Sequence, residues 1–314
     1  MIDVTGDHYT IHFRDVRLWS NALCFNEQKK KIQSVIDAVQ AHSLLDHDNL
    51  GQLLQSHPSA NLLGFPKGVD VPNLAGLHKL IGENWIGERI LEARSYQVMR
   101  AVNSQVAPGQ PPILIIFPPI FHVQLTNAYQ ANRLSKYLKE IRESLLANLP
   151  QFIAFTFNKE GVHWLTSIVV TEDLLVYQGD SLDWAPDDKL PIKLKWFLSD
   201  VMEVQGRWRE KALGVPLQGP SSGSCRVISM SVIHSFVEPV AAAWSIDQAL
   251  DFRMTWLKEF LEHHIAAVRS PHNVSHRWLI LKQIFDSIIT ASFLPNLSAL
   301  GLTSFPPVLP TSCI

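Results

Sequence analysis

Three side chains of this sequence could together carry nucleophilic chemistry. Cys225 stands where the glycine- and serine-rich stretch "GPSSGS" becomes a helical pattern. Free backbone N–H groups and the helix dipole at such a position favour a thiolate. His163 and Asp180 lie on two short apolar runs joined by "TED". A hairpin could place this carboxylate beside the imidazole and hold the ring in one tautomer. The set predicts a thiol nucleophile with a general base and an orienting acid.

An oxyanion formed by thiolate attack also needs hydrogen-bond donors. Gln218 precedes Cys225 in the same glycine-bearing stretch, and its side-chain amide could supply one donor. The backbone N–H of Cys225 would supply the second. Each residue also has an ordinary structural interpretation: a buried inert cysteine, an edge-strand histidine bonded to a carbonyl, and an aspartate in an Asx turn. We favour the chemical interpretation because all the required types occur together.

The elements that must position these residues can be predicted from hydrophobic periodicity. Apolar runs rich in β-branched and aromatic residues predict strands, and 3.6-residue spacing predicts helices. The strands predicted within 152–179 cluster without intervening helices, which favours an α+β fold over a doubly wound one. The predicted strands are 113–117, 152–157, 163–170 and 174–181, with an extended stretch at 212–219. The predicted helices are about 27–41, 84–105, 132–149, 193–204, 224–237 and 247–268.

Composition limits the functional class. The chain has 46% hydrophobic and 18% charged residues and a formal charge of −2. These values are typical of a globular protein and give no reason to expect nucleic acid or an anionic membrane as partner. No stretch approaches the roughly 20 apolar residues of a spanning helix. Three cysteines without framework spacing favour a reducing compartment, so we expect an intracellular protein, nuclear or cytoplasmic. Oligomeric state is left open.

We expect neither a metal nor an organic cofactor. Four histidines invite a metal interpretation, but their spacing fits no standard zinc site and no cysteine accompanies them. We therefore interpret them as exposed helix and loop histidines. Arg253, in the last predicted helix, either pairs with a carboxylate beneath the Cys225 helix or lies on a solvated face, and the second is favoured. The four histidines are His263, His264, His272 and His276.

Six motifs in order resemble the SUMO-specific cysteine proteases, which process ubiquitin-like modifiers and share their fold with the adenovirus endopeptidase. The resemblance covers about residues 77–266. It rests on the family's tryptophan-bearing helix start, the segment after its next strand, its His-Trp strand, its Asp-Ser-Leu, its Pro-x-Gln…Cys segment and its C-terminal helix. These correspond here to "NWIGERI", "IFHVQL", "FTFNKEGVHWLTSIVV", Asp180-Ser181-Leu182, "VPLQGPSSGSCR" and "DFRMTWLKEFL".

The resemblance implies a papain-like architecture of the ubiquitin-like protease type, with a small central mixed sheet flanked by helices. It also implies a domain plan: an N-terminal extension of unknown role (1–75), a catalytic domain (76–268), and a C-terminal helical extension with a frayed tail (269–314). The implied activity is cleavage after the Gly-Gly terminus of a SUMO-type modifier, through a thioester. The implied partner is that modifier or its conjugates.

The resemblance also implies a role for each site residue. Cys225 would be the nucleophile, His163 the general base and acid, Asp180 the orienting residue and Gln218 the oxyanion donor. Trp85 and Trp164 would line a narrow channel for the Gly-Gly terminus; the alternative is that both tryptophans are ordinary core residues. Such a channel makes physical sense, because glycine lacks a Cβ and indoles form broad apolar walls.

A second interpretation is a catalytically inactive relative that binds a ubiquitin-like protein as an adaptor. Two features favour it: Arg226 stands where the family has a glycine after the nucleophile, and the loop from Gln218 to Cys225 is one residue longer than usual. A thiol near a ring nitrogen of His163 and an open channel would favour the enzyme. A guanidinium that fills the channel would favour the adaptor.

Overall fold

The computed structural model describes residues 2–3, 8–9, 13–54, 60–159, 161–202, 208–219 and 222–270. The chain divides into two compact units. One, here the sheet unit, comprises Phe65–Pro72 and Lys79–Leu257; the other, here the helical unit, comprises Met1–Gly64, Asn73–His78 and Lys258–Ile314. The domain boundaries given above stay a prediction, and most of the predicted C-terminal extension lies outside the described residues.

The sheet unit is built on a five-stranded mixed sheet. Its strands, in spatial order, are β3 (Leu114–Phe117), β4 (Phe152–Lys159), β5 (His163–Val170), β6 (Leu175–Asp180) and β7 (Arg209–Ala212). The β4–β5 and β5–β6 pairs are antiparallel, whereas β3–β4 and β6–β7 are parallel. The central strands are buried almost throughout. Burial on both faces explains why they read as apolar runs rather than as alternating patterns.

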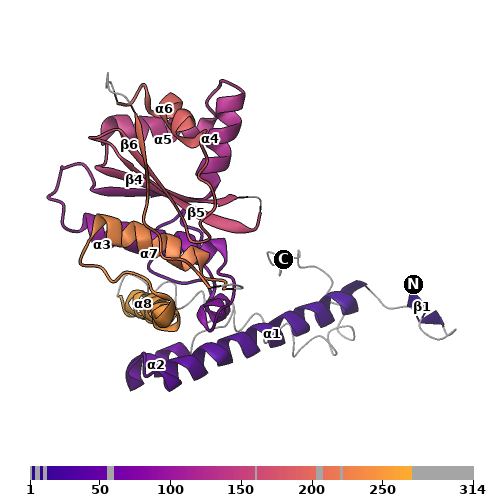
Figure 1. Ribbon diagram of the computed structural model, residues 1–314. Coiled ribbons are helices and arrows are strands. Elements are labelled where there is room, and N and C mark those ends of the chain that lie inside the picture. The colour runs from indigo at the N-terminus through magenta and orange to yellow at the C-terminus, as the bar shows by residue number, and fades with distance from the viewer. Residues whose placement is uncertain are drawn as a thin grey trace. The chain divides into compact units, whose positions relative to one another are not determined.

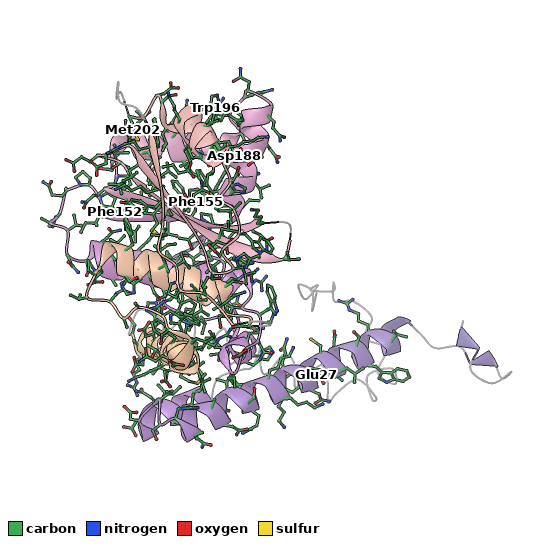
Figure 2. The ribbon with its side chains drawn as sticks, viewed as in Figure 1. Glu27, Phe152, Phe155, Asp188, Trp196 and Met202 are labelled. Carbon is green, nitrogen blue, oxygen red and sulfur yellow. The ribbon has the colours of Figure 1, made fainter. Side chains whose placement is uncertain are left out.

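Helices cover both faces of this sheet (Figure 1). On one face lie α3 and α7, and on the other lie α4, α5 and α6. The faces follow from strand alternation, because successive side chains point in opposite directions. Figure 2 labels two side chains of β4, Phe152 and Phe155. Phe152 contacts Phe236 of α7, whereas Phe155 contacts Phe121 of α4. The helices of this unit are α3 (Glu88–Asn103), α4 (Ile120–Gln130), α5 (Lys136–Ala147), α6 (Leu190–Leu198), α7 (Cys225–Val237) and η2 (Ile246–Gln248).

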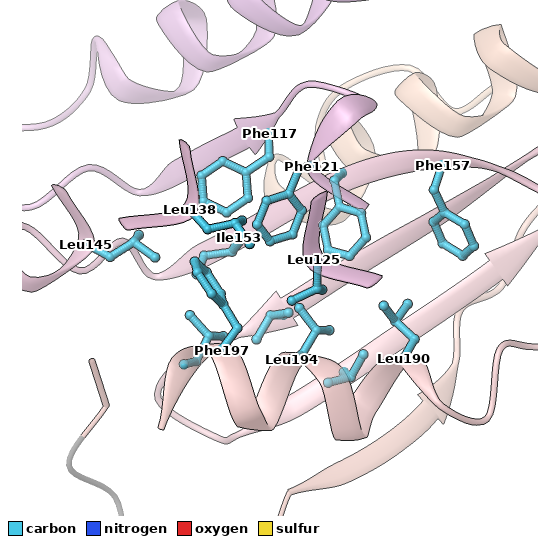
Figure 3. Packing of buried hydrophobic residues seen from close by; sticks show 14 of the residues in the cluster. Phe117, Phe121, Leu125, Leu138, Leu145, Ile153, Phe157, Leu190, Leu194 and Phe197 are labelled. Atoms are coloured by element: carbon cyan, nitrogen blue, oxygen red, sulfur yellow. The ribbon is translucent and has the colours of Figure 1, made fainter. Parts of the chain in front are cut away.

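The face under α4, α5 and α6 contains a continuous apolar cluster (Figure 3). Aromatic rings dominate its centre, where Phe121 lies edge-on to Phe155 and to Phe197. On the opposite face, the Thr166 hydroxyl of β5 donates to the Ser229 carbonyl of α7, 3.4 Å away. Helix α7 packs on this face of the sheet and is buried along most of its length.

The helical unit contains α1 (Phe13–Ala41), α2 (His47–Leu54), most of η1 (Leu74–Leu80), the short strands β1 (Ile2–Asp3) and β2 (His8–Tyr9), and the C-terminal part of α8 (Ala249–Arg269). The second half of α1 buries one stripe at i, i+3, i+4 and i+7 spacing, the pattern of an amphipathic helix. This stripe consists of Ile32, Val35, Ile36 and Val39.

The α+β class and the central mixed sheet flanked by helices are confirmed. Three helix boundaries were wrong. The helix predicted over about 27–41 is α1, which begins already at Phe13. The helix predicted over 84–105 begins only at Glu88, after the N-cap Gly87, so Trp85 and Ile86 lie in the segment before it. The helix predicted over 193–204 is α6, which begins and ends earlier. Helix α4 forms from "IFHVQL" and the residues after it, for which no helix was predicted.

Candidate active site

His163 and Asp180 meet at the end of the β5–β6 pair. Leu165 is the direct partner of Asp180 in the ladder, so His163, two residues away, is its diagonal neighbour on the same face. The His163 Nε2 lies 2.6 Å from the Asp180 Oδ1, and both side chains are buried. The same oxygen accepts the backbone N–H of Leu182 at 2.6 Å. Because the carboxylate engages Nε2, Nδ1 is the ring nitrogen left to exchange a proton with a thiol.

Cys225 is the first residue of α7 and only 1% exposed. Burial raises the pKa of its thiol, opposed by backbone N–H groups of Trp164, Arg226 and Cys225 itself and by the Arg226 guanidinium. The N–H of Trp164 belongs to the residue that follows His163. Helix α7 packs against β5, the strand that carries the imidazole, and Cys225 lies at the positive end of this helix.

Gln218 is tied to the residue after Asp180. Its backbone N–H donates to the Ser181 carbonyl at 3.0 Å, and the Ser181 hydroxyl donates to its Oε1 at 3.4 Å. These contacts engage the amide oxygen and leave Nε2 as the donor end. The predicted oxyanion donor and the predicted orienting acid thus lie on segments that are hydrogen-bonded to each other.

The two predicted channel tryptophans have different surroundings. Trp85 is 54% exposed, whereas Trp164 is 2% exposed. The Arg226 guanidinium lies over the Trp164 ring, 4.1 Å from its centroid, and its Nη1 donates to the Ile86 carbonyl. Arg226 therefore spans the two segments that were predicted to form the channel walls.

Arg253 was expected on a solvated face, and this expectation was wrong. The side chain is 1% exposed. One Nη1 donates to the carbonyls of Lys79 and Asn84, at 3.2 and 2.9 Å, and Nη2 donates to the Ser224 hydroxyl at 3.4 Å. Arg253 thus joins the segment before Trp85 to the residue before Cys225.

Sequence reasoning missed Trp184. Its ring centroid lies 5.0 Å from that of His163, and the Lys159 amino group lies 5.9 Å from its centroid. Asp183, at φ +56°, turns the chain here through the left-handed region, which aspartate tolerates better than most residues. The available signal was a tryptophan in an otherwise acidic turn directly after Asp180.

The histidine prediction was wrong for His264, which is buried. Its Nδ1 accepts the backbone N–H of Leu63 at 3.0 Å, within the helical unit. His272 and His276 lie outside the described residues. Where the chain is described, no group of three or more histidine, cysteine, aspartate or glutamate side chains could hold a metal ion. None of the described helices is long and apolar enough to cross a membrane.

Comparison of the sequence with protein-family models and with curated proteins finds no match. The fold, in contrast, is similar to solved structures. These include the SUMO protease Ulp1 with its catalytic cysteine oxidised to a sulfenic acid, at 15% identity and a TM-score of 0.54, covering 70% of this chain and 97% of that one.

Two further structures agree. The Ulp1 protease domain in complex with Smt3, the yeast ortholog of SUMO, is 15% identical with a TM-score of 0.53, over 70% of this chain and 97% of that one. The catalytic domain of the Chaetomium thermophilum Ulp1-like SUMO protease is 16% identical with a TM-score of 0.53, over 74% and 94%. This chain has the Ulp1-like protease fold.

Proposed function

We propose that the protein is a cysteine peptidase that cleaves after the C-terminal Gly-Gly of a SUMO-type ubiquitin-like modifier. The observation that carries the proposal is the buried His163–Asp180 pair, with Nδ1 unengaged by the carboxylate, on the strand against which the helix that begins at Cys225 packs. The fold and the residue types agree with this chemistry. Nuclear or cytoplasmic placement remains part of the proposal.

In the proposed reaction His163 Nδ1 takes the thiol proton and the Cys225 sulfur attacks the glycine carbonyl carbon. The oxyanion accepts hydrogen bonds from Gln218 Nε2 and from the Cys225 N–H. Its collapse expels the amine, which receives the proton from His163, and leaves a thioester. Water, deprotonated by His163, then attacks the thioester carbonyl; the C–S bond breaks, the Cys225 sulfur recovers the proton from His163, and the modifier leaves with a free carboxylate. Asp180 holds the imidazole in the productive tautomer and stabilises its charged form.

One observation favours a second candidate, an adaptor that binds a ubiquitin-like protein without cleaving it. The Arg226 guanidinium occupies the face of Trp164 where a Gly-Gly terminus would pass. A permanently occupied channel would exclude the substrate from the thiol while leaving outer surfaces free to bind.

The test is covalent labelling with a panel of ubiquitin-like proteins that carry an electrophile in place of the C-terminal carboxylate. A peptidase forms an adduct with one modifier on Cys225, and Cys225→Ala abolishes it. Cys24→Ala is the matched control and keeps the adduct.

Absence of any adduct from the whole panel, with a folded protein whose Cys225 reacts with a small alkylating reagent, would contradict the peptidase. Binding of one modifier without labelling would support the adaptor.

A further inference from the structure

We infer that the Arg226 side chain is a displaceable plug, which blocks access to the Cys225 thiol in the free protein. The inference rests on the proposed function, whose site it completes. The Arg226 side chain moves aside when a peptide terminus binds and replaces the contacts that the guanidinium makes.

The first step is the position of the side chain. Arg226 follows the nucleophile at the start of α7, and its guanidinium contacts the Trp164 indole and the Ile86 carbonyl. The backbone N–H of the same Trp164 opposes the burial that raises the pKa of the Cys225 thiol. One tryptophan thus acts on the thiol through its backbone and contacts the guanidinium through its ring.

The second step is accessibility. A nucleophile must be reached by the carbonyl carbon it attacks, and Cys225 is 1% exposed. The backbone around it is fixed: Gly223 lies so close to the segment before Trp85 that an added Cβ would be 2.4 Å from the Glu83 carbonyl oxygen. Arg253 ties the same segments together. A side chain can move more readily than this backbone, and Arg226 is only partly buried.

The third step is release. Among the described residues, the buried Arg226 Nε has no hydrogen-bond partner. A guanidinium has five donors in a fixed fork, so donors remain for the carbonyls of an incoming extended peptide. An entering terminus can therefore replace the Ile86 carbonyl as acceptor while glycine, without a Cβ, fits against the indole.

The experiment measures alkylation of Cys225 by iodoacetamide against pH, read by mass spectrometry of the Cys225 peptide. The plateau rate at high pH, where all the thiol is thiolate, reports access, whereas the midpoint reports the charge nearby. We expect Arg226→Gly and Arg226→Gln to raise the plateau about tenfold, because both lose the stacked cation. Arg226→Lys keeps the charge but not the planar fork, and should lie between them and the wild type.

A plateau unchanged in both the glycine and the glutamine variant would overturn the inference. Near-ultraviolet circular dichroism checks that each variant is folded. If the glycine variant does not fold, the glutamine variant alone provides the test. The modifier panel separates the two proposals. A raised plateau without labelling by any modifier keeps the plug and rejects the peptidase. Labelling of wild type and variants at equal rates, with equal plateaus, keeps the peptidase and rejects the plug.

Discussion

Asp180 shares one carboxylate oxygen between the His163 ring and the Leu182 N–H, so both contacts depend on the same atom. Asp180→Asn weakens the charge that stabilises the imidazolium and permits the tautomer with Nδ1 protonated, which cannot accept the thiol proton. We expect kcat for a fluorogenic modifier substrate to fall about 100-fold or more. Asp173→Asn, in the turn at the far end of the same hairpin, should retain full turnover. Equal rates for both variants would contradict the orienting role.

Gln218 is the second test at the scale of single residues. If Nε2 contacts only the oxyanion, Gln218→Ala removes an interaction made in the transition state, and kcat falls about 100- to 1000-fold with KM little changed. Ser181→Ala releases the amide oxygen but keeps the donor, so its loss should be smaller. Steady-state kinetics of both variants distinguish this role. A rise in KM with unchanged kcat would instead place Gln218 in substrate binding.

At the scale of elements, Gly223 sets how closely the loop before α7 approaches the segment that carries Trp85. A Cβ on Gly223 would lie 2.4 Å from the Glu83 carbonyl oxygen, and backbone cannot yield as a side-chain tip can. Gly223→Ala should therefore lower the free energy of unfolding in urea by about 1–3 kcal/mol. Gly214→Ala is the matched control, because nothing lies within 4 Å of its added Cβ. A Gly223→Ala variant with an unchanged free energy of unfolding would mean that the loop before α7 can shift to make room for the methyl group.

The elements that were most predictable from sequence are those determined by residues close to one another in the chain. The β5–β6 hairpin follows from two adjacent apolar runs and a short turn, and its register alone brings His163 to Asp180. The start of α7 at Cys225 follows from a glycine- and serine-rich loop. Arg226 and Arg253 could not be placed, because their partners Ile86 and Lys79 are distant in the sequence. No periodicity distinguishes an arginine that fills a gap between segments from one on a solvated face.

At the scale of the whole molecule, His264 makes the stability of the chain depend on pH. Burial, and then the neighbouring His263, lower its pKa from 6.5 to about 4. Its Nδ1 accepts the Leu63 N–H, so the folded state needs the neutral ring. Below pH 6.5 the His264 ring binds a proton in the unfolded chain but stays neutral in the folded chain until the pH approaches about 4. The contribution of the neutral His264 ring to the free energy of unfolding is thus fully present above pH 6.5. It is lost progressively as the pH falls toward about 4.

This pKa shift corresponds to a loss of about 3 kcal/mol in the free energy of unfolding between pH 6.5 and about pH 4. Other groups titrate in the same range, so the measurement is a difference: urea unfolding of wild type and His264→Gln at pH 7 and pH 4. The glutamine variant should be less stable at pH 7 but lose less on acidification, because it has no ring to protonate. His263→Gln keeps the buried ring and should retain most of the pH dependence. Identical acid sensitivity in wild type and His264→Gln would show that His264 does not titrate in this range, and the acid lability would then belong to carboxylates elsewhere in the chain.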